Sequence, residues 1–189
     1  MHRNSWILLI FTLLLISCDN AAYSNKRSNN SPVQTEQIAT EKPRKETLQF
    51  KKGEEYSVKV VGIADGDTFT GLTANNKQIK CRLYGIDAPE KKQAFSNRSK
   101  QALSDLIFGK QVKIIIQNKD RYGRAVVWVY TFDGKDISAE MLKMGMAWHF
   151  KQYSKDIEYA KLENTARQQK NGLWIDKNCV APWEYRKKK

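Results

Sequence analysis

Residues 64–90 read ADGDTFTGLTANNKQIKCRLYGIDAPE, and this stretch decides the fold and the chemistry that we expect. The run at 77–84 is β-rich and partly alternates apolar and polar residues, which predicts a β-strand, and 67–70 is predicted as a second short strand. The Asn-Asn pair between them is typical of a turn. Acidic and basic side chains stand at the ends of these strands: Asp65, Asp67, Arg82, Asp87 and Glu90.

These side chains suggest one kind of site. Carboxylates on short turns can bind a hard cation, because such ions prefer oxygen ligands. An arginine beside them suits a phosphate group, since its planar fork donates two parallel hydrogen bonds. The stretch therefore predicts a metal-dependent phosphodiesterase site.

Each motif alone also has a simpler interpretation. Asp65-Gly66-Asp67-Thr68 is above all a turn signal, and it is not an EF-hand loop, because Thr70 stands where that loop needs Gly. Residues 87–90 also have the composition of a turn. Arg82 strengthens the second motif, since an unpaired guanidinium at a buried sheet end would be costly.

The rest of the chain completes a small domain. Further β-rich runs at 56–63, 112–116 and 125–130 bring the expected strands to five. Helical spacing predicts helices at 95–108, 136–144 and about 154–170, the last with Ser154 as its cap. Five strands with about three helices predict an α+β fold, a five-stranded OB-type β-barrel whose face suits nucleotide chains.

A substrate rim is expected beside the acids. Residues 120–124 read Asp-Arg-Tyr-Gly-Arg and precede the 125–130 strand. Tyr122 could stack on bases, which needs no sequence preference, and Arg121 and Arg124 could contact phosphates. The same segment could simply be a basic hairpin end. Further rim candidates, each of which could equally be a solvated surface residue, are Lys91, Lys92, Lys151 and Tyr153.

The N-terminal part is expected to stay outside the fold. Residues 1–17 have the charged start, apolar middle and small residues of a secretory signal peptide. Leu-Ile-Ser before Cys18 resembles a bacterial lipobox, which implies lipidation of Cys18 and an anchor on the outer face of the cytoplasmic membrane. A signal anchor with an incidental cysteine is the alternative. We expect a disordered tether at 18–49, the domain at 50–176 and a basic extension at 177–189.

Net charge, cysteines and histidines limit the partners and metal sites that we expect. The chain has 33 Lys and Arg against 20 Asp and Glu, a net charge of +13, which favours nucleic acid or anionic lipid as a partner. Cys81 and Cys179 could form a disulfide outside the cell or remain two free thiols. His149 is the only histidine after His2, so no His/Cys zinc cluster is expected. A carboxylate is the expected base.

Three motifs together resemble a known family. Asp-Gly-Asp-Thr at 65–68, Arg-Leu-Tyr-Gly-Ile-Asp-Ala-Pro-Glu at 82–90 and Asp-Arg-Tyr-Gly-Arg at 120–124 are similar, in order and spacing, to thermonucleases, the staphylococcal nuclease-like family. The resemblance covers about residues 56–174. Pro182-Trp183-Glu184 resembles an ending common among bacterial members.

The resemblance implies a five-stranded OB barrel and Ca²⁺-dependent hydrolysis of DNA and RNA that leaves 3′-phosphate and 5′-hydroxyl ends. It implies that Asp67, Asp87 and the Ala88 carbonyl hold Ca²⁺, and that Glu90 is the general base. By the same resemblance, Arg82 and Arg124 bind the scissile phosphate and Tyr122 lines the nucleotide pocket. Two departures affect substrate binding: the segment after Glu90 is short, and Tyr153 alone remains of the tyrosines expected near Lys151.

Two other functions are compatible with a basic barrel. An OB module could hold single strands without cutting them, although degenerate copies of this domain lose the acids and arginines that this chain retains. A structural lipoprotein could bind anionic envelope polymers, and it would show no calcium-dependent release of nucleotides. For the nuclease we expect a monomer that acts on nucleic acid.

Overall fold

The structure is a computed structural model that describes residues 51–188. The expected signal peptide, the lipidation site at Cys18 and the tether at 18–49 lie outside the described residues. Among the residues described, no helix is long and apolar enough to cross a membrane.

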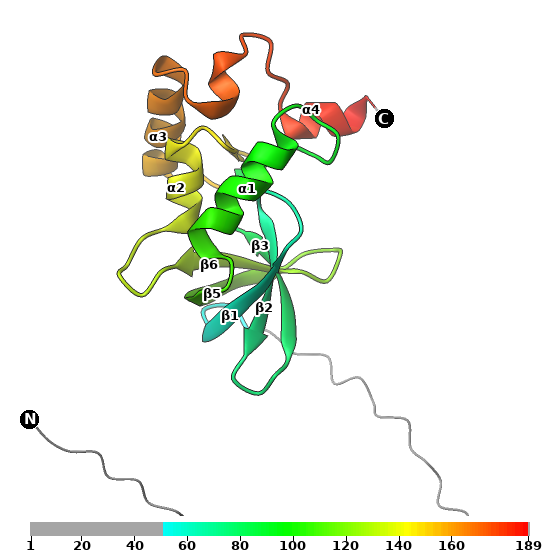
Figure 1. Cartoon of the computed structure of the whole chain (residues 1–189), viewed down its shortest axis with the longest axis vertical. Coiled ribbons are helices and arrows are strands. Elements are labelled where there is room, and N and C mark those ends of the chain that lie inside the picture. Colours follow the sequence, from blue (N-terminus) through cyan, green and yellow to red (C-terminus); the bar gives the residue numbers. More distant parts are fainter. Residues whose placement is uncertain (1–50, 189) are drawn as a thin grey trace, which may run out of the picture. The chain divides into compact units, whose positions relative to one another are not determined.

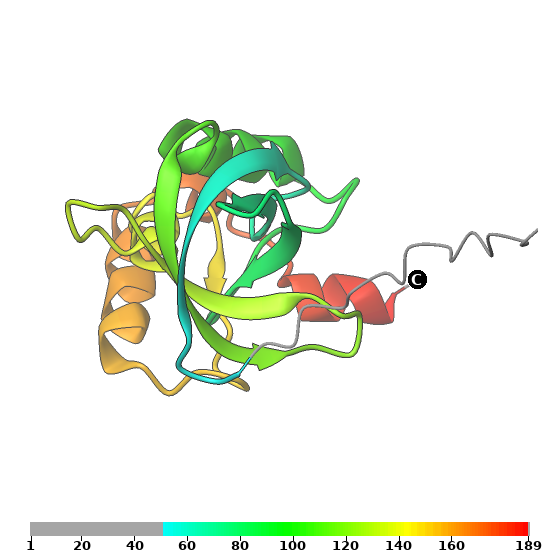
Figure 2. The ribbon, with the colours of Figure 1, turned by 90° about the horizontal axis from the view of Figure 1, so that it is seen from below.

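Five strands close into a barrel in the order β1-β2-β3-β6-β5 (Figures 1 and 2). Their bounds are β1 Glu55–Ile63, β2 Thr68–Thr73, β3 Gln78–Leu83, β5 Gln111–Lys119 and β6 Ala125–Tyr130. All neighbouring pairs are antiparallel except β3 and β6, which run parallel and complete the ring. This arrangement confirms the predicted five-stranded OB-type barrel.

The barrel interior follows from the alternation of side chains along the strands. In β5, Val112, Ile114 and Ile116 are buried while the residues between them are more exposed. Val58 and Val60 of β1 fill the same interior. Each such side chain contributes about 1.5–3 kcal/mol by leaving water, so the period-two pattern fixes the register of the barrel strands.

The helices gather toward one end of the barrel, with α3 and α4 on opposite sides in both views (Figures 1 and 2). They are α1 Ser96–Ile107, α2 Ile137–Lys143, α3 Ile157–Gln168 and α4 Pro182–Lys187, with a 3₁₀ turn η1 at Gly172–Ile175. The first three match the predicted helices. The fourth is additional, and it begins at a proline, as helix starts often do.

The predicted cap of α3 is wrong by two residues. Asp156 is the cap, and its carboxylate accepts hydrogen bonds from the N–H groups of Glu158 and Tyr159. Ser154 is buried instead, and its hydroxyl lies 3.1 Å from Nε2 of His149. The serine hydroxyl is therefore a hydrogen-bond partner of a buried imidazole and not a helix cap.

A second, smaller cluster extends the core beyond the barrel. Two short strands, β4 Ile86–Asp87 and β7 Trp148–His149, pair antiparallel. Trp148 packs there with buried residues of α3, η1 and the segment before α4: Ala166, Leu173, Trp174 and Ala181. The side chain of Gln93 donates a hydrogen bond to the Val180 carbonyl at 2.7 Å. These contacts fix the approach of α4 to the domain.

The disulfide considered from the sequence does not form, since Cys81 and Cys179 are both free. Cys81 is buried in the barrel core, whereas Cys179 packs against the second cluster. The two thiols therefore belong to separate packing units.

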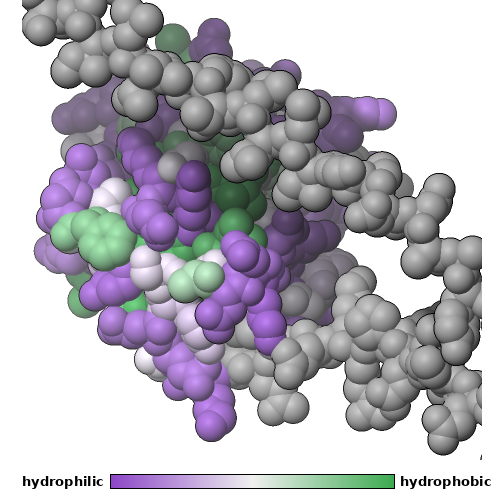
Figure 3. All heavy atoms as spheres, turned by 60° about the horizontal axis from the view of Figure 1, so that its bottom comes forward, coloured by the Kyte–Doolittle hydropathy of each residue, from purple (hydrophilic) through white to green (hydrophobic). Residues whose placement is uncertain are grey.

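The outer surface shown in Figure 3 is mainly hydrophilic, with hydrophobic residues in small patches, as expected for so basic a chain.

Candidate active site

The first acidic turn is fixed by its packing against α1. Gly66 has no room for a side chain, because an added Cβ would collide with the hydroxyl of Ser99 on α1. Ser99 itself is held by a 2.7 Å hydrogen bond to the Met146 carbonyl. The N–H of Asp67 donates to the carboxylate of Asp65 at 3.2 Å. This tight turn buries Asp67, which is 6% exposed.

Arg82 joins two acids from different segments. Sheet register places it opposite Thr68, next to Asp67. Its Nη1 donates to Oδ2 of Asp67 at 2.9 Å, and its Nη2 donates to Oδ1 of Asp87 at 2.7 Å. The Arg82 side chain is 14% exposed. A sheet-end arginine is expected to need partners, and Arg82 has two: its guanidinium lies between the carboxylates of Asp67 and Asp87.

Asp87 is held at the end of the sheet by β4. It pairs with Trp148 of β7 and is only 1% exposed. The next residue, Ala88, donates its N–H to Oδ2 of Asp67 at 3.0 Å. The two acidic motifs are thus joined by a main-chain hydrogen bond as well as by Arg82.

Glu90 meets an arginine that the sequence analysis did not select. Oε1 of Glu90 accepts from Nη1 of Arg186 on α4 at 2.6 Å. The same guanidinium donates to Asp87, with Nη2 at 2.8 Å from Oδ2 and Nη1 at 3.3 Å from Oδ1. Glu90 is positioned by its own main chain too, because its N–H donates to the Gln93 side chain at 2.9 Å.

The five side chains form a row of alternating charge. The order, set by the contacts above, is Asp67, Arg82, Asp87, Arg186 and Glu90. Three carboxylates share two guanidiniums, which leaves one negative charge uncompensated. A negative excess between partly buried acids attracts a cation.

The acids differ in how their surroundings affect ionisation. Burial and the neighbouring charge of Asp67 raise the pKa of Asp65 to about 7. Burial would also raise the pKa of Asp67, but Arg82 and the Ala88 N–H outweigh it and hold that pKa below its ordinary value. Burial raises the pKa of Asp87, against the opposing effect of Arg186. Of these three aspartates, Asp67 alone has its pKa lowered.

Arg124 lies beside this row but is not paired with its acids. Its Nε donates to Oδ2 of Asp120 at 2.7 Å, and its Nη1 donates to the Thr68 hydroxyl at 3.1 Å. That hydroxyl in turn donates to Oδ1 of Asp67 at 2.9 Å. The second guanidinium is thus linked to the first acid through one threonine.

Tyr122 and Arg121 form the outer part of the same loop. The Tyr122 side chain is 69% exposed, with the guanidiniums of Arg121 and Arg124 4.9 and 5.4 Å from the ring centroid. Arg121 also donates to the Tyr122 hydroxyl at 2.7 Å. The ring is accessible for stacking and is flanked by positive charge.

The other rim candidates are not joined to the charged row by any contact among the described residues. Tyr153 is 64% exposed, packs on Phe150 and accepts a hydrogen bond from Tyr84 through its carbonyl. Lys91 and Lys92 are exposed. Lys151 forms an ion pair with Glu163 instead. Their expected roles in substrate binding stay predictions.

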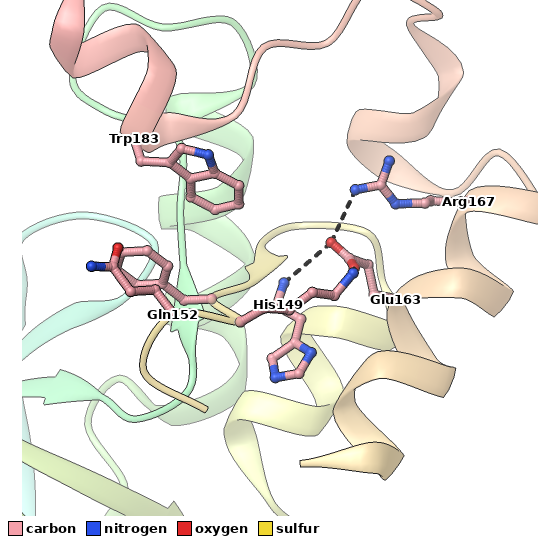
Figure 4. A pocket seen from close by; sticks show the side chains of 7 residues that line it. His149, Gln152, Glu163, Arg167 and Trp183 are labelled. Atoms are coloured by element: carbon pink, nitrogen blue, oxygen red, sulfur yellow. Dashed lines mark hydrogen bonds and ion pairs between the residues drawn. The ribbon is translucent and has the colours of Figure 1, made fainter. Parts of the chain in front are cut away.

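A cavity of about 260 Å³ lies elsewhere, beside α3 and α4 (Figure 4). Its wall includes the buried carboxylate of Glu163, which accepts from Arg167 at 3.0 Å and from the His149 N–H at 3.3 Å. Trp183 closes the opposite side and stacks on Phe150. The acids of the row do not line this cavity.

The residues of the row fit calcium in donor chemistry. The available donors are carboxylate oxygens, which hard cations prefer. The described residues contain no group of three or more His, Cys, Asp or Glu side chains that could hold a metal ion on their own. A cation here would have few protein ligands and would need oxygens from water or substrate. We therefore expect the site to bind the cation with modest affinity.

Arg186 and Gln93 were missed by the sequence analysis. The tail after residue 176 was expected to be only a basic extension, yet its helix brings Arg186 to Asp87, 99 residues away. Pro182 followed by Trp-Glu-Tyr-Arg-Lys does contain the signal of a short helix, with proline at its start and cations at its end. What the pattern cannot provide is the direction in which that helix points.

Comparison with known proteins gives a consistent result. The model of the family described as "Staphylococcal nuclease homologue" matches residues 80–176. The chain is 47% identical to a Haemophilus influenzae protein named "uncharacterized endonuclease" over 134 residues, which are 71% of this chain and 75% of that protein. It is 40% identical to a Shigella flexneri "micrococcal nuclease" over 143 residues, or 70% and 82% of the two chains. An Arabidopsis thaliana "Staphylococcal-like nuclease CAN1" is 43% identical over 60% of this chain and 35% of its own length.

Proposed function

The chain belongs to the staphylococcal nuclease homologue family, and from this premise we propose that it is a calcium-dependent nuclease that hydrolyses phosphodiester bonds of DNA, RNA or both. One observation carries the proposal: Arg82 binds Asp67 and Asp87 at 2.9 and 2.7 Å in a single fork. That contact brings two carboxylates, the proposed cation ligands, to the same point as a guanidinium, the proposed phosphate-binding group.

In this proposal the guanidiniums bind and orient the phosphodiester. Arg82 donates one N–H to each acid, and a guanidinium has five N–H groups, so donors remain for phosphate oxygens. Arg124, held by Asp120, would bind the same phosphate from the side of Thr68. As water attacks, charge grows on the phosphate oxygens, and fixed donors aimed at them lower the barrier.

Glu90 would take the proton from the attacking water. Its side chain is 33% exposed and lies at the open end of the row, where solvent can reach it. A positioned carboxylate base is needed because calcium acidifies water weakly in comparison with zinc. Asp67 and Asp87, with the Ala88 carbonyl, are the proposed holders of Ca²⁺, which when bound would stabilise the charge of the phosphate.

The proposal extends to products and location. Attack by water on phosphorus with loss of the 5′-oxygen would leave 3′-phosphate and 5′-hydroxyl ends. The lipobox resemblance at Cys18 supports an exported, membrane-anchored enzyme. A non-cleaving OB module is the second candidate. It would bind nucleic acid as the nuclease does but would not cleave it.

The deciding experiment compares DNA and RNA digestion by the purified protein in Ca²⁺ and in chelator. We expect cleavage only with Ca²⁺, and a loss of about 10²–10³-fold in rate for Glu90→Gln. Glu184→Gln removes an exposed carboxylate from α4 and is the matched control with wild-type rate. Undiminished cleavage by Glu90→Gln would remove the base assignment, and binding without cleavage would favour the OB module.

A further inference from the structure

Arg186 is the one member of the charged row that comes from outside the three sequence motifs. It stands on α4, the last helix of the described residues, and its side chain is 41% exposed. Helix α4 is fixed at its start, where Ala181 and Pro182 are buried. Trp183 adds a parallel stack on Phe150 with ring centroids 5.3 Å apart. The position of Arg186 is therefore set by packing rather than by its charge alone.

The contacts of Arg186 place a positive charge on the carboxylates that would receive the cation. It donates to both oxygens of Asp87, at 2.8 and 3.3 Å, and to Glu90 at 2.6 Å. Arg82 already donates to Oδ1 of Asp87. Both oxygens of Asp87 are thus engaged by guanidinium groups, and a cation that binds this carboxylate must compete with Arg186.

Resting on the proposed calcium-dependent function, we propose that Arg186 is a positioning residue of the site that acts as an internal counter-cation. It holds Asp87 and Glu90 together before calcium binds, and calcium binding displaces it from Asp87. Arg186 therefore lowers the calcium affinity of the site. In return it prevents the mutual repulsion of two acids and fixes Glu90 while the site contains no metal.

The direction of this effect separates a counter-cation from a residue with a merely structural role. Loss of a structural contact loosens Asp87 and Glu90 and weakens calcium binding. Loss of a competing positive charge strengthens it, because charges a few ångströms apart interact appreciably at a partly exposed site. The ion pair is partly screened, so a modest change is expected.

The test is calcium titration of the purified full chain by calorimetry, without substrate. We expect Arg186→Met to bind calcium about three- to tenfold more tightly than the wild type. Arg186→Lys keeps the charge but loses the fork that binds two acids, so its calcium affinity should lie between those of the wild type and Arg186→Met. Lys187→Met removes the same charge one residue away on an exposed side chain of α4, and it should also match the wild type.

A second readout follows stability rather than affinity. In chelator, Arg186→Met should have a lower melting temperature than Lys187→Met, because Asp87 and Glu90 have lost their shared partner. Added calcium should raise the melting temperature of Arg186→Met more than that of the wild type, since tighter binding to the folded state stabilises it more.

The outcomes separate this inference from the proposed function. Equal or weaker calcium binding by Arg186→Met would overturn the counter-cation role, even if the wild type cleaves DNA in calcium. Binding by Arg186→Met when the wild type binds none would support it strongly. If neither protein binds calcium, the inference is overturned, and the digestion experiment decides separately whether the chain is a nuclease.

Discussion

Two regions of this protein bury carboxylates beside arginines, and they differ in how charge is shared. At the charged row, Asp67, Asp87 and Glu90 share two guanidiniums. At the Glu163 cluster, defined here as Glu163 with His149, Lys151 and Arg167, two cations serve one carboxylate. The row has an excess of negative charge and the cluster an excess of positive charge.

The difference teaches that burial and ion pairing alone do not distinguish the proposed active site from another buried ion-pair cluster. Glu163 is 1% exposed and lies beside a cavity, the features often used to locate a site. Arg167, however, stands one turn along the same helix, and Lys151 lies 3.0 Å from Oε2 without forming a hydrogen bond to it. The cluster ties α3 to β7, whereas the row joins acids from two motif loops at a sheet end.

The same conservative substitution in both regions should give the largest contrast. Arg82→Lys keeps a charge but loses the fork that binds two acids at once, and we expect the rate of DNA cleavage to fall about 10²–10³-fold. Arg167→Lys, at a side chain that is 44% exposed, should change that rate less than about twofold. Initial rates in saturating calcium measure both. Equal losses in the two variants would mean that the two regions do not differ in function.

Removing the buried charge of the Glu163 cluster should affect stability and leave the chemistry unchanged. Glu163→Gln loses charge-assisted hydrogen bonds to Arg167 and the His149 N–H, and we expect the free energy of unfolding to fall by about 1–2 kcal/mol. Urea denaturation measures the change, and cleavage rates should stay within about twofold.

Glu158→Gln is the matched control for that prediction. It lies on the same helix in an exposed ion pair with Lys161, so its effect should be below about 0.5 kcal/mol. A large loss of activity in Glu163→Gln at unchanged stability would instead give the cluster a role in catalysis.

Most of the barrel and much of the row could be predicted from the sequence, for a physical reason. Period-two alternation and turn residues are local signals, and they gave the five strands to within a few residues. Asp67, Arg82 and Asp87 stand at predicted strand ends, where barrel closure has to bring them together. The family resemblance added roles that no local pattern contains.

What could not be predicted depends on packing between distant segments. The position of α4 relies on the second cluster, on Gln93 bonding to Val180, and on Trp183 stacking on Phe150. None of these contacts has a periodic signature, so the sequence around Arg186 predicts only a basic tail. Ser154 was misplaced for a similar reason, because its buried partner His149 is a tertiary contact.

The pH dependence of stability should sharpen the comparison further. Burial, together with the charge of Lys151, lowers the pKa of His149 below 6.5, although Glu163 opposes the shift. In acid, His149 binds a proton more readily in the unfolded chain than in the folded chain. Its contribution to stability is therefore present above pH 6.5 and is lost as the pH falls through the lowered pKa. Each pKa unit of difference corresponds to about 1.4 kcal/mol.

Asp65, on the turn beside the charged row, contributes the opposite slope in the same range, because burial and the charge of Asp67 raise its pKa to about 7. Its contribution is present at low pH and is lost as the pH rises through 7. Urea unfolding in chelator at pH 5.5 and 7.5 separates the contribution of His149 to stability from that of Asp65. His149→Asn should lose less stability on acidification than the wild type, and an identical loss in both proteins would contradict the assignment.

The smallest expected effect concerns the aromatic ring at the mouth of the row. Tyr122 is 69% exposed, and two guanidiniums flank its ring, so a base that stacks there has to share the ring with them. Stacking of a base on an aromatic ring is worth about 1–3 kcal/mol per base, and a ring shared with guanidiniums should contribute less. We therefore expect Tyr122→Ala to raise the KM for DNA only about two- to fivefold, with kcat unchanged.

Phe132→Ala is the matched control for this last prediction, since Phe132 is an aromatic residue 72% exposed on the turn after β6. It should leave both KM and kcat at wild-type values. Steady-state kinetics with a single-stranded oligonucleotide measures the two parameters separately. A fall in kcat for Tyr122→Ala would mean that the ring also positions Arg124, which lies 5.4 Å from its centroid. The boundary of the catalytic region would then extend from the acids to the loop at 120–124.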